Sequence, residues 1–270
     1  MDQPEAYIPQ ILYSCYYENS RSGEHFVSEH VLSYQVAGSL VHMDGKHEYR
    51  IGPGGMRLVT KNQLVKAQKI PPADGPFKSL SVYLDQGMLK EFSTEHHIVS
   101  QQQAVRPAAV VINGNPMLGT FFESLRIYAE NEGFTNPDLI KIKQREAIVL
   151  LLQADPSLKD LLFDFSQPHK IDLEEFMNKN YQFNVRMERF ATLTGRSLAT
   201  FKRDFEKQFG VTPGKWLQNK RLQEAYYQLK ELGKTPSDVY WDVGFEDLSH
   251  FSFAFKKKFG VAPTGVLLSR

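Results

Sequence analysis

One short stretch near the C-terminus is repeated fifty positions further along the chain, and this repeat constrains the fold more than any other feature. The stretch Phe201–Pro213 returns as Phe251–Pro263, and each copy holds three Phe residues four positions apart. Phe at i, i+4 and i+8 forms a narrow apolar stripe along one face of a helix. Each copy then has a Gly suited to a left-handed helix cap and, three residues later, a Pro. The repeat predicts two capped helices of one design, with Lys and Arg on much of the face opposite the stripe.

The basic charge of the chain is concentrated in the part that holds the repeat. The 270 residues have a formal net charge of +1. Residues 1–165 hold 15 Lys and Arg against 19 Asp and Glu, a net charge of −4, whereas residues 166–270 hold 17 against 12, a net charge of +5. A cationic surplus on one module favours binding to phosphate groups. The length and this asymmetry predict two domains, residues 1–165 and 166–270.

The first hundred residues are predicted to be mainly β. Short runs of strand-forming residues alternate with Gly- and Pro-rich turns, as in a small barrel or sandwich. The pair Asp44-Gly45 is a strong signal for a tight hairpin turn. The expected strands lie within Val31–Val41, His47–Ile51, Met56–Thr60, Leu64–Ile70 and Phe77–Leu84.

From about Pro116 the apolar period becomes helical. Amphipathic helices are expected from Pro116 to about Gly133 and over Leu139–Gln153, and Pro156 opens a short third helix. These helices either form a packing or dimerisation surface or merely cover the barrel. After a boundary at residues 166–169, the expected helices are 172–179, 185–193, 197–208, 213–230, 237–243 and 247–258. The predicted fold class is therefore α+β, a β-rich part followed by helices and then an all-α domain.

The all-α domain is predicted to contain two helix-turn-helix units. The first turn lies at Thr194-Gly195 with Ser197 as the cap of the next helix, and the second lies at Gly244 with Glu246 or Asp247 as the cap. A turn Gly lets two helices cross steeply, and such a pair presents its second helix to the DNA major groove. Residues 214–229 form a rod between the units. The apolar side chains expected to pack this rod against both units are Trp216, Leu217, Ala225, Tyr226 and Leu229.

Four stretches of the last hundred residues resemble the DNA-binding domain of the arabinose-operon regulator (AraC) family of bacterial transcription factors. They are Phe190–Ser197, Arg221–Ala225, Gly244–Phe251 and Phe255–Gly260, and the resemblance covers residues 172–266. It implies a sequence-specific regulator, more often an activator, whose two recognition helices enter adjacent major grooves on one face of double-stranded DNA. It further implies contact with RNA polymerase, a homodimer and an N-terminal cupin-like barrel that senses an effector.

The resemblance also implies which side chains face the groove. In the first reader, the first recognition helix, they are Ala199, Thr200, Lys202 and Arg203. In the second reader they are Ser249, His250, Ser252 and Phe253, with Lys256 and Lys257 on phosphate. Two positions depart from the family pattern, because Phe253 stands where Arg is frequent and Tyr240 stands where a small residue is usual. We therefore expect the first reader to carry more of the specificity, and His250 to have a structural or phosphate role rather than base reading.

The N-terminal domain contains few motifs that indicate a ligand. His42, His47 and Glu48 flank the predicted hairpin, but metal-dependent cupins place two His one residue apart, so we expect a solvated hairpin and no metal. His96 and His97 are expected to be exposed near a helix end. Among the tyrosines, Tyr13, Tyr34 and Tyr49, with Tyr16 and Tyr17, could line an aromatic pocket for a small molecule such as a sugar, or could be barrel core. The alternatives are a protein partner or a dimerisation domain without a ligand.

Signals for catalysis, secretion or membrane insertion are weak in this sequence. No Gly-rich phosphate loop follows a strand and no nucleophile elbow surrounds a Ser, while Cys15 has no flanking cation to lower its pKa. A single Cys excludes an internal disulfide, and the acidic start lacks a signal segment. We predict a cytoplasmic, nucleoid-associated regulator that is not an enzyme, uses no cofactor and enters no membrane. The rival hypotheses are a metal-dependent cupin enzyme with an accessory DNA-binding domain, and an architectural or protein-binding module.

Overall fold

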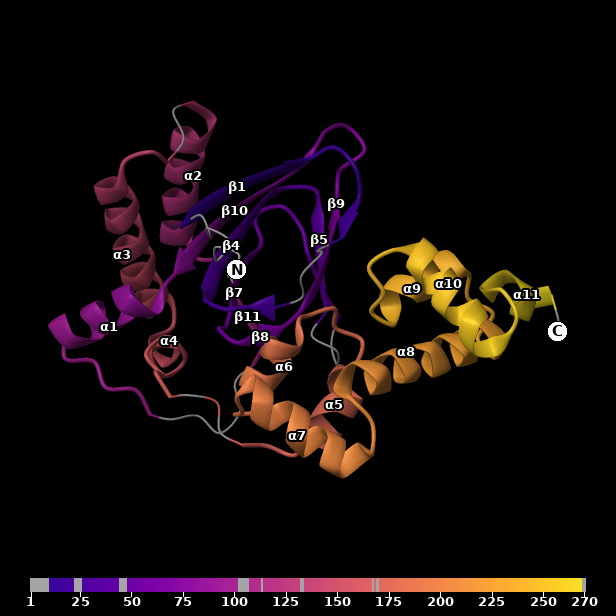
Figure 1. Cartoon of the computed structure of the whole chain (residues 1–270). Coiled ribbons are helices and arrows are strands. Elements are labelled where there is room, and N and C mark those ends of the chain that lie inside the picture. Colours follow the sequence, from indigo (N-terminus) through magenta and orange to yellow (C-terminus); the bar gives the residue numbers. More distant parts are fainter. Residues whose placement is uncertain are drawn as a thin grey trace. The chain divides into compact units, whose positions relative to one another are not determined.

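The computed structural model describes residues 10–21, 26–43, 48–101, 107–112, 114–131, 134–166, 168 and 170–268 (Figure 1). The chain divides into two compact units, one built mainly from residues 27–166 and the other mainly from residues 167–270. The predicted Asp44-Gly45 turn, His47, Gly133, Gln167 and His169 lie outside the described residues.

The larger sheet of the first unit has five antiparallel strands. In spatial order they are β1 (Ile11–Tyr16), β10 (Phe77–Leu84), β4 (His30–Ala37), β7 (Met56–Val59) and β11 (Ala109–Ile112). A second sheet has the order β2 (Ser20–Arg21), β9 (Lys66–Ile70), β5 (Ser39–Met43) and β6 (Glu48–Ile51). The two remaining described strands, β3 (Phe26–Val27) and β8 (Gln63–Leu64), are two residues long.

Alternation along the strands decides which face of the larger sheet is covered. Tyr34 of β4 pairs with Leu80 of β10, and the neighbouring pair, Ser33 and Ser81, points the opposite way with its Oγ atoms 3.0 Å apart. Leu80 is fully buried in one large cluster with apolar residues of three helices. These helices are α1 (Gln86–Glu95), α2 (Pro116–Asn131) and α3 (Pro137–Ala154). Figure 1 shows α2 and α3 side by side near β1 and β10.

Most expected elements of the first unit are present with small shifts. The range of β10 is the expected Phe77–Leu84, whereas the run Val31–Val41 is divided into β4 and β5 at Gly38, which has φ of +78°. His96 and His97 are exposed directly after α1, as expected. The short helix predicted at Pro156 is a 3-10 turn, η1 (Pro156–Leu158), that continues into α4 (Lys159–Leu162).

The second unit is all-α. Its described helices are α5 (Leu173–Asn180), α6 (Met187–Leu193), α7 (Leu198–Phe209), α8 (Pro213–Lys230), α9 (Pro236–Asp242), α10 (Leu248–Phe259) and α11 (Pro263–Leu268). The last of these has no counterpart among the expected helices. The preceding helix ends at the Gly260 cap, and Pro263 begins α11, because Pro is well suited to the first position of a helix. The predicted order of a β-rich part, helices and an all-α part is confirmed.

Helix α8 is the connector that the sequence predicts. Near its start the Trp216 ring lies 5.7 Å from Phe205 and 5.5 Å from Phe209 of α7. Near its end the Tyr226 ring lies 6.2 Å from Phe255 and 4.8 Å from Phe259 of α10. The other three expected contact residues, Leu217, Ala225 and Leu229, are buried. At about 1.5 Å per residue, the 18-residue helix is a rod of roughly 27 Å that packs on both helix-turn-helix units.

Candidate nucleic-acid interface

The first reader is α7, and its start is fixed by a tight turn and a side-chain cap. Helix α6 ends at Thr194, and Gly195 follows with φ of +66°. The Ser197 hydroxyl then accepts a hydrogen bond from the Thr200 amide at 3.3 Å. Phe201 and Phe205 of the stripe are fully buried. Burial of the stripe leaves the opposite face of α7 to solvent.

The groove-facing residues expected on α7 lie on this outward face. Ala199, Lys202 and Arg203 are exposed and Thr200 is half-buried. The Arg203 side chain is 74% exposed. Its Nη2 lies 3.4 Å from Asp204 Oδ1, a surface ion pair of the kind that contributes little stability. Most of the Arg203 donors therefore remain available to a ligand.

Arg196 holds Asp204 at the side of the first reader. Arg196 Nε donates to Asp204 Oδ2 at 3.2 Å, and its Nη1 donates to the carbonyls of Ile171 and Thr194 at 3.0 and 2.7 Å. The hydrogen bond from Arg196, followed by the charges of Lys170 and Arg203, holds the pKa of Asp204 below its usual range. Asp204 is thus a charged structural partner of the turn, with one carboxylate oxygen on Arg196 and the other near the exposed Arg203.

The second reader, α10, repeats this design with different outward side chains. Asp247 caps it by accepting from the His250 amide at 2.7 Å, and Phe251 and Phe255 are fully buried. The expected residues Ser249, His250, Phe253, Lys256 and Lys257 are exposed, and Ser252 is half-buried. The His250 ring also packs edge-on at 5.5 Å against Phe245. Tyr240, one of the departures from the family pattern, lies partly buried against the core of this unit.

Not every cation of the repeat belongs to the outward face. Lys258 Nζ donates to the carbonyl and the side-chain oxygen of Asn219 on α8, at 2.9 and 3.1 Å. Burial lowers the pKa of Lys258. Lys258 therefore fastens the end of α10 to the connector, while Lys256 and Lys257 point to solvent.

A half-buried arginine joins the connector to the loop that follows α5, a contact that the sequence did not predict. Arg221 of α8 donates from Nε to the Tyr181 carbonyl and from Nη2 to the Phe183 carbonyl, both at 2.7 Å. Burial lowers its pKa to about 10. Gly244, in the turn of the second helix-turn-helix, packs against this junction. A Cβ built on Gly244 would lie 2.7 Å from the Gln182 carbonyl and 2.9 Å from Arg221 Nε. Arg221 thus lies where the α5 loop, α8 and the second turn meet.

The three tyrosines proposed as effector ligands do not come together. Tyr13 and Tyr34 flank Leu80 on the face of the larger sheet that carries α2, where Tyr34 stacks on Phe122 with ring centroids 5.0 Å apart. The Tyr13 hydroxyl is 3.5 Å from Glu130 of α2. Tyr49 lies in the other sheet. Tyr16 and Tyr17 are exposed. An aromatic pocket formed jointly by these residues is therefore absent, because the two sheets place them on different faces.

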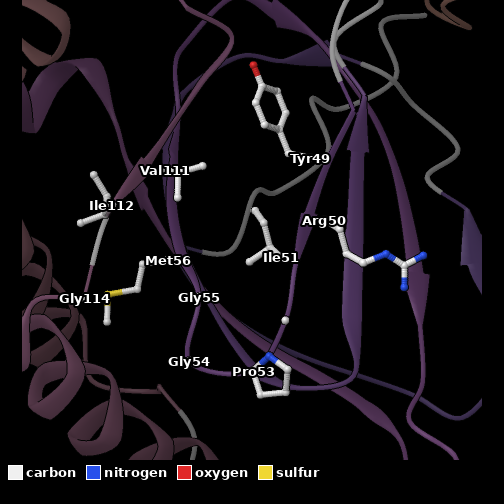
Figure 2. Close-up of a pocket in the computed structure, with 11 residues that line it drawn as sticks. Tyr49, Arg50, Ile51, Pro53, Gly54, Gly55, Met56, Val111, Ile112 and Gly114 are labelled. Carbon is white, nitrogen blue, oxygen red and sulfur yellow. The ribbon is translucent and has the colours of Figure 1, made fainter.

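Tyr49 does line a pocket of about 410 Å³ with residues of β6, β7 and β11 (Figure 2). Figure 2 shows Ile51, Met56, Val111 and Ile112 gathered on one side, whereas the Arg50 side chain points away from them. Tyr49 and Arg50 have the only polar side chains of the lining, and they project in different directions. The Gly-rich turn between β6 and β7 also lines the pocket, so polar and apolar atoms contribute to its wall in similar measure.

The expectation that His42 lies on a solvated hairpin is wrong. His42 is only 1% exposed, and its Nδ1 lies 2.5 Å from Nη1 of the buried Arg57. Since Arg57 can only donate, His42 Nδ1 accepts this hydrogen bond. Both faces of β5 are covered at this point, since Leu40, Val41 and His42 are all buried. Within the described residues, no group of three His, Cys, Asp or Glu is placed to hold a metal ion, and no helix is long and apolar enough to cross a bilayer.

Two outward-facing recognition helices on one connector define the class of protein, a double helix-turn-helix transcription regulator. A model of a helix-turn-helix domain matches residues 190–268, and a model of the ExsA N-terminal regulatory domain matches residues 30–165. The chain belongs to the AraC family of transcriptional regulators, in the branch that carries the ExsA N-terminal regulatory domain.

Two relatives match most of the chain. The transcriptional regulator ExsA of Pseudomonas aeruginosa is 24% identical over 232 residues, which cover 85% of this chain and 82% of ExsA. The virulence regulon transcriptional activator VirF of Yersinia enterocolitica is 24% identical over 261 residues, which cover 94% of this chain and 91% of VirF. Among solved structures, ToxT from Vibrio cholerae covers 96% of this chain and 98% of its own, with 13% identity and a TM-score of 0.41, too low to add to the assignment.

Proposed function

We propose that α7 and α10 read base edges in adjacent major grooves of one operator, and that this binding activates transcription. The observation that supports base reading is the equivalence of the two helices, each with its Phe stripe buried and its polar face exposed, on one connector of roughly 27 Å. One helical turn of DNA is about 34 Å, so two readers at the ends of such a rod suit successive grooves on one side of the duplex.

Within this proposal the outward residues have different roles. Arg203 and Lys202 donate to guanine O6 and N7, or to phosphate, and Thr200 supports them from the first turn of α7 while Ala199 leaves room for the base edge. On α10, Ser249 and Ser252 donate to base edges or phosphate, and His250 and the two exposed lysines Lys256 and Lys257 contact phosphate. The first unit, residues 1–165, serves as the regulatory domain, and residues 166–270 as the DNA-binding domain.

Substitution of Arg203 separates base reading from phosphate binding. Arg203→Ala is expected to weaken binding to the specific duplex by about 1–3 kcal/mol, with much less effect on random DNA, because a guanidinium that makes two bonds to one base discriminates among bases. The measurement is a titration of the full chain with a selected duplex and a random duplex over a salt series. An equal loss on both duplexes would assign Arg203 to phosphate instead.

Lys257→Ala is the matched control on the other reader. It removes one cation that is assigned to phosphate, so binding should fall by a similar factor on both duplexes, and the dependence of log affinity on log salt should become shallower by about one unit. Wild-type protein that binds all duplexes with one affinity would contradict base reading altogether.

Activation is proposed from the names of relatives, since VirF is described as a transcriptional activator. We propose that the bound chain contacts RNA polymerase and that it acts in the cytoplasm, on the nucleoid, without catalytic activity of its own. The test is a reporter gene placed downstream of a selected duplex, whose expression should rise when the chain is produced. Reduced expression would make the chain a repressor.

We propose that the first unit also forms a homodimer and responds to an effector, either a small molecule or a protein partner. Large apolar side chains on α2 and α3 support dimerisation, since Ile127 and Ile142 are each 60% exposed. Sedimentation of the full chain measures the monomer–dimer equilibrium, and Ile142→Glu should shift this equilibrium toward the monomer. For the effector, the pocket beside Tyr49 offers space for a small molecule, whereas Tyr13 and Tyr34 are packed against the core of the first unit. A chain that stays monomeric at all concentrations would exclude the dimer.

A further inference from the structure

The two readers carry opposite chemistry at one equivalent position. Fifty residues separate Arg203 from Phe253, the interval of the repeat, so both occupy the same place on their helices, six residues after the capping residues Ser197 and Asp247. Both project into solvent, since the Arg203 side chain is 74% exposed and the residue Phe253 is 71% exposed. A guanidinium is a multiple hydrogen-bond donor, whereas a phenyl ring is neither donor nor acceptor.

Phe253 has no part in the core of its own unit. The core-facing positions of α10 are filled by Phe251, Ala254 and Phe255, all of which are buried. Phe253 lies on the other side of the helix, one turn after His250 and one turn before Lys257, which are both exposed. A large apolar side chain is thus held in solvent between a polar first turn and a cationic last turn. This position is the centre of the face that the proposed function turns toward DNA.

Only one base offers an apolar partner to such a side chain in the major groove. The edges of guanine, adenine and cytosine present hydrogen-bonding groups there, and thymine alone adds the C5 methyl group. We call the DNA segments under α7 and α10 the first and second half-sites. We propose that Phe253 selects thymine in the second half-site by packing on this methyl group. The inference rests on the proposed DNA binding and specifies which base the second reader requires.

A consequence concerns the symmetry of the operator. Because Arg203 suits guanine and Phe253 suits thymine, the two half-sites read by one chain differ at the equivalent base pair. One chain therefore binds in a single orientation. Lys256 and Lys257 position α10 on phosphate and carry no sequence information themselves.

The test uses the full chain and a duplex recovered by selection from a random pool. Each thymine is replaced in turn by deoxyuridine, which keeps the base pair and removes only the methyl group. At one or more thymines of the second half-site, the replacement should lower the affinity of the wild type about fourfold, the factor that corresponds to burying one methyl-sized group. Phe253→Ala should bind the thymine and the deoxyuridine duplexes equally.

Two further variants serve as matched controls. Phe253→Tyr keeps the ring, so its affinity should still depend on the methyl group. Lys257→Ala should lower the affinity for the thymine and the deoxyuridine duplexes by the same factor, so that the fourfold ratio between them persists. Circular dichroism spectra should coincide for all variants, because the substituted side chains are exposed.

The proposal is overturned if no thymine is sensitive to the replacement, or if Phe253→Ala keeps the full discrimination at every position. Either result leaves specific binding, and hence the proposed function, intact. Failure of the selection to enrich any duplex would instead overturn both. Unchanged affinity of Phe253→Ala for every duplex would also overturn the proposal and would indicate that the phenyl ring faces a protein partner.

Discussion

Replacing Gly244 with alanine is expected to lower the free energy of unfolding of the second unit by about 3–5 kcal/mol. Two costs add at this turn. The backbone of Gly244 has φ of +99°, a conformation that residues with a Cβ rarely adopt. In addition, the new Cβ would lie 2.7 Å from the Gln182 carbonyl and 2.9 Å from Arg221 Nε. Neither neighbour moves easily, because Arg221 is fixed by two hydrogen bonds.

The measurement is urea unfolding of the full chain followed by tryptophan fluorescence. Both tryptophans, Trp216 and Trp241, belong to the second unit, so the signal reports on that unit alone. Gly210→Ala is the matched control, since Gly210 also has positive φ, +70°, but a Cβ there would meet nothing within 4 Å. It should cost only about 1 kcal/mol. Equal losses in the two variants would show that the contact with Gln182 and Arg221 is not tight.

The second unit could be predicted from the sequence because its signals are local. The Phe stripe, the capping residues and the Gly at each helix end define α7 and α10 to within a residue of the expected ranges. Among the described helices of this unit, α11 alone has no expected counterpart. Its Pro263 is ambiguous in sequence, since a Pro shortly after a helix prevents that helix from continuing and also suits the first position of a new one. The outward faces followed directly, because burial of one stripe decides the opposite side.

The first unit shows where local patterns give less information. The range of β10 follows from its alternation, but alternation does not say which face of a sheet is covered. The sequence therefore predicted a surface position for His42, whereas both faces of β5 are covered and His42 lies inside, against Arg57. For the same reason, the tyrosines could not be grouped correctly, since Tyr34 and Tyr49 lie in different sheets.

Arg221 was beyond prediction because its partners are far away in sequence. It lies in one of the stretches that carry the family resemblance, yet its acceptors are main-chain carbonyls 38 and 40 residues earlier. No side-chain pattern indicates a carbonyl acceptor. The residue also explains why Gly244 must be a glycine, since the guanidinium and the Gln182 carbonyl occupy the space that a Cβ would need. Arg221 is therefore the residue on which the packing of the α5 loop, the connector and the second turn depends.

Arg221→Met is expected to destabilise the second unit by about 2–4 kcal/mol, because it keeps most of the aliphatic stem but leaves the Tyr181 and Phe183 carbonyls without their donor. The stability of Arg221→Lys should lie between those of the wild type and Arg221→Met, since an ammonium group lacks the planar fork that reaches both carbonyls. Unfolding followed by tryptophan fluorescence measures both variants. Lys215→Ala, an exposed change on the same helix, should stay within about 0.5 kcal/mol of the wild type.

The pH dependence of the Arg221→Met effect distinguishes burial of a charge from other causes. Burial lowers the pKa of Arg221 to about 10, so the folded state disfavours the charged form and stability gains from this group only as the pH rises above about 10. Between about pH 6 and pH 9 the group stays charged in both folded and unfolded chains, and the difference between wild type and Arg221→Met should therefore be constant. A difference that changes across that range would mean that another titrating group is coupled to Arg221.

The loss of both carbonyl contacts in Arg221→Met should also loosen the second turn relative to the connector. Arg221→Met should therefore tolerate an added base pair between the two half-sites better than the wild type does.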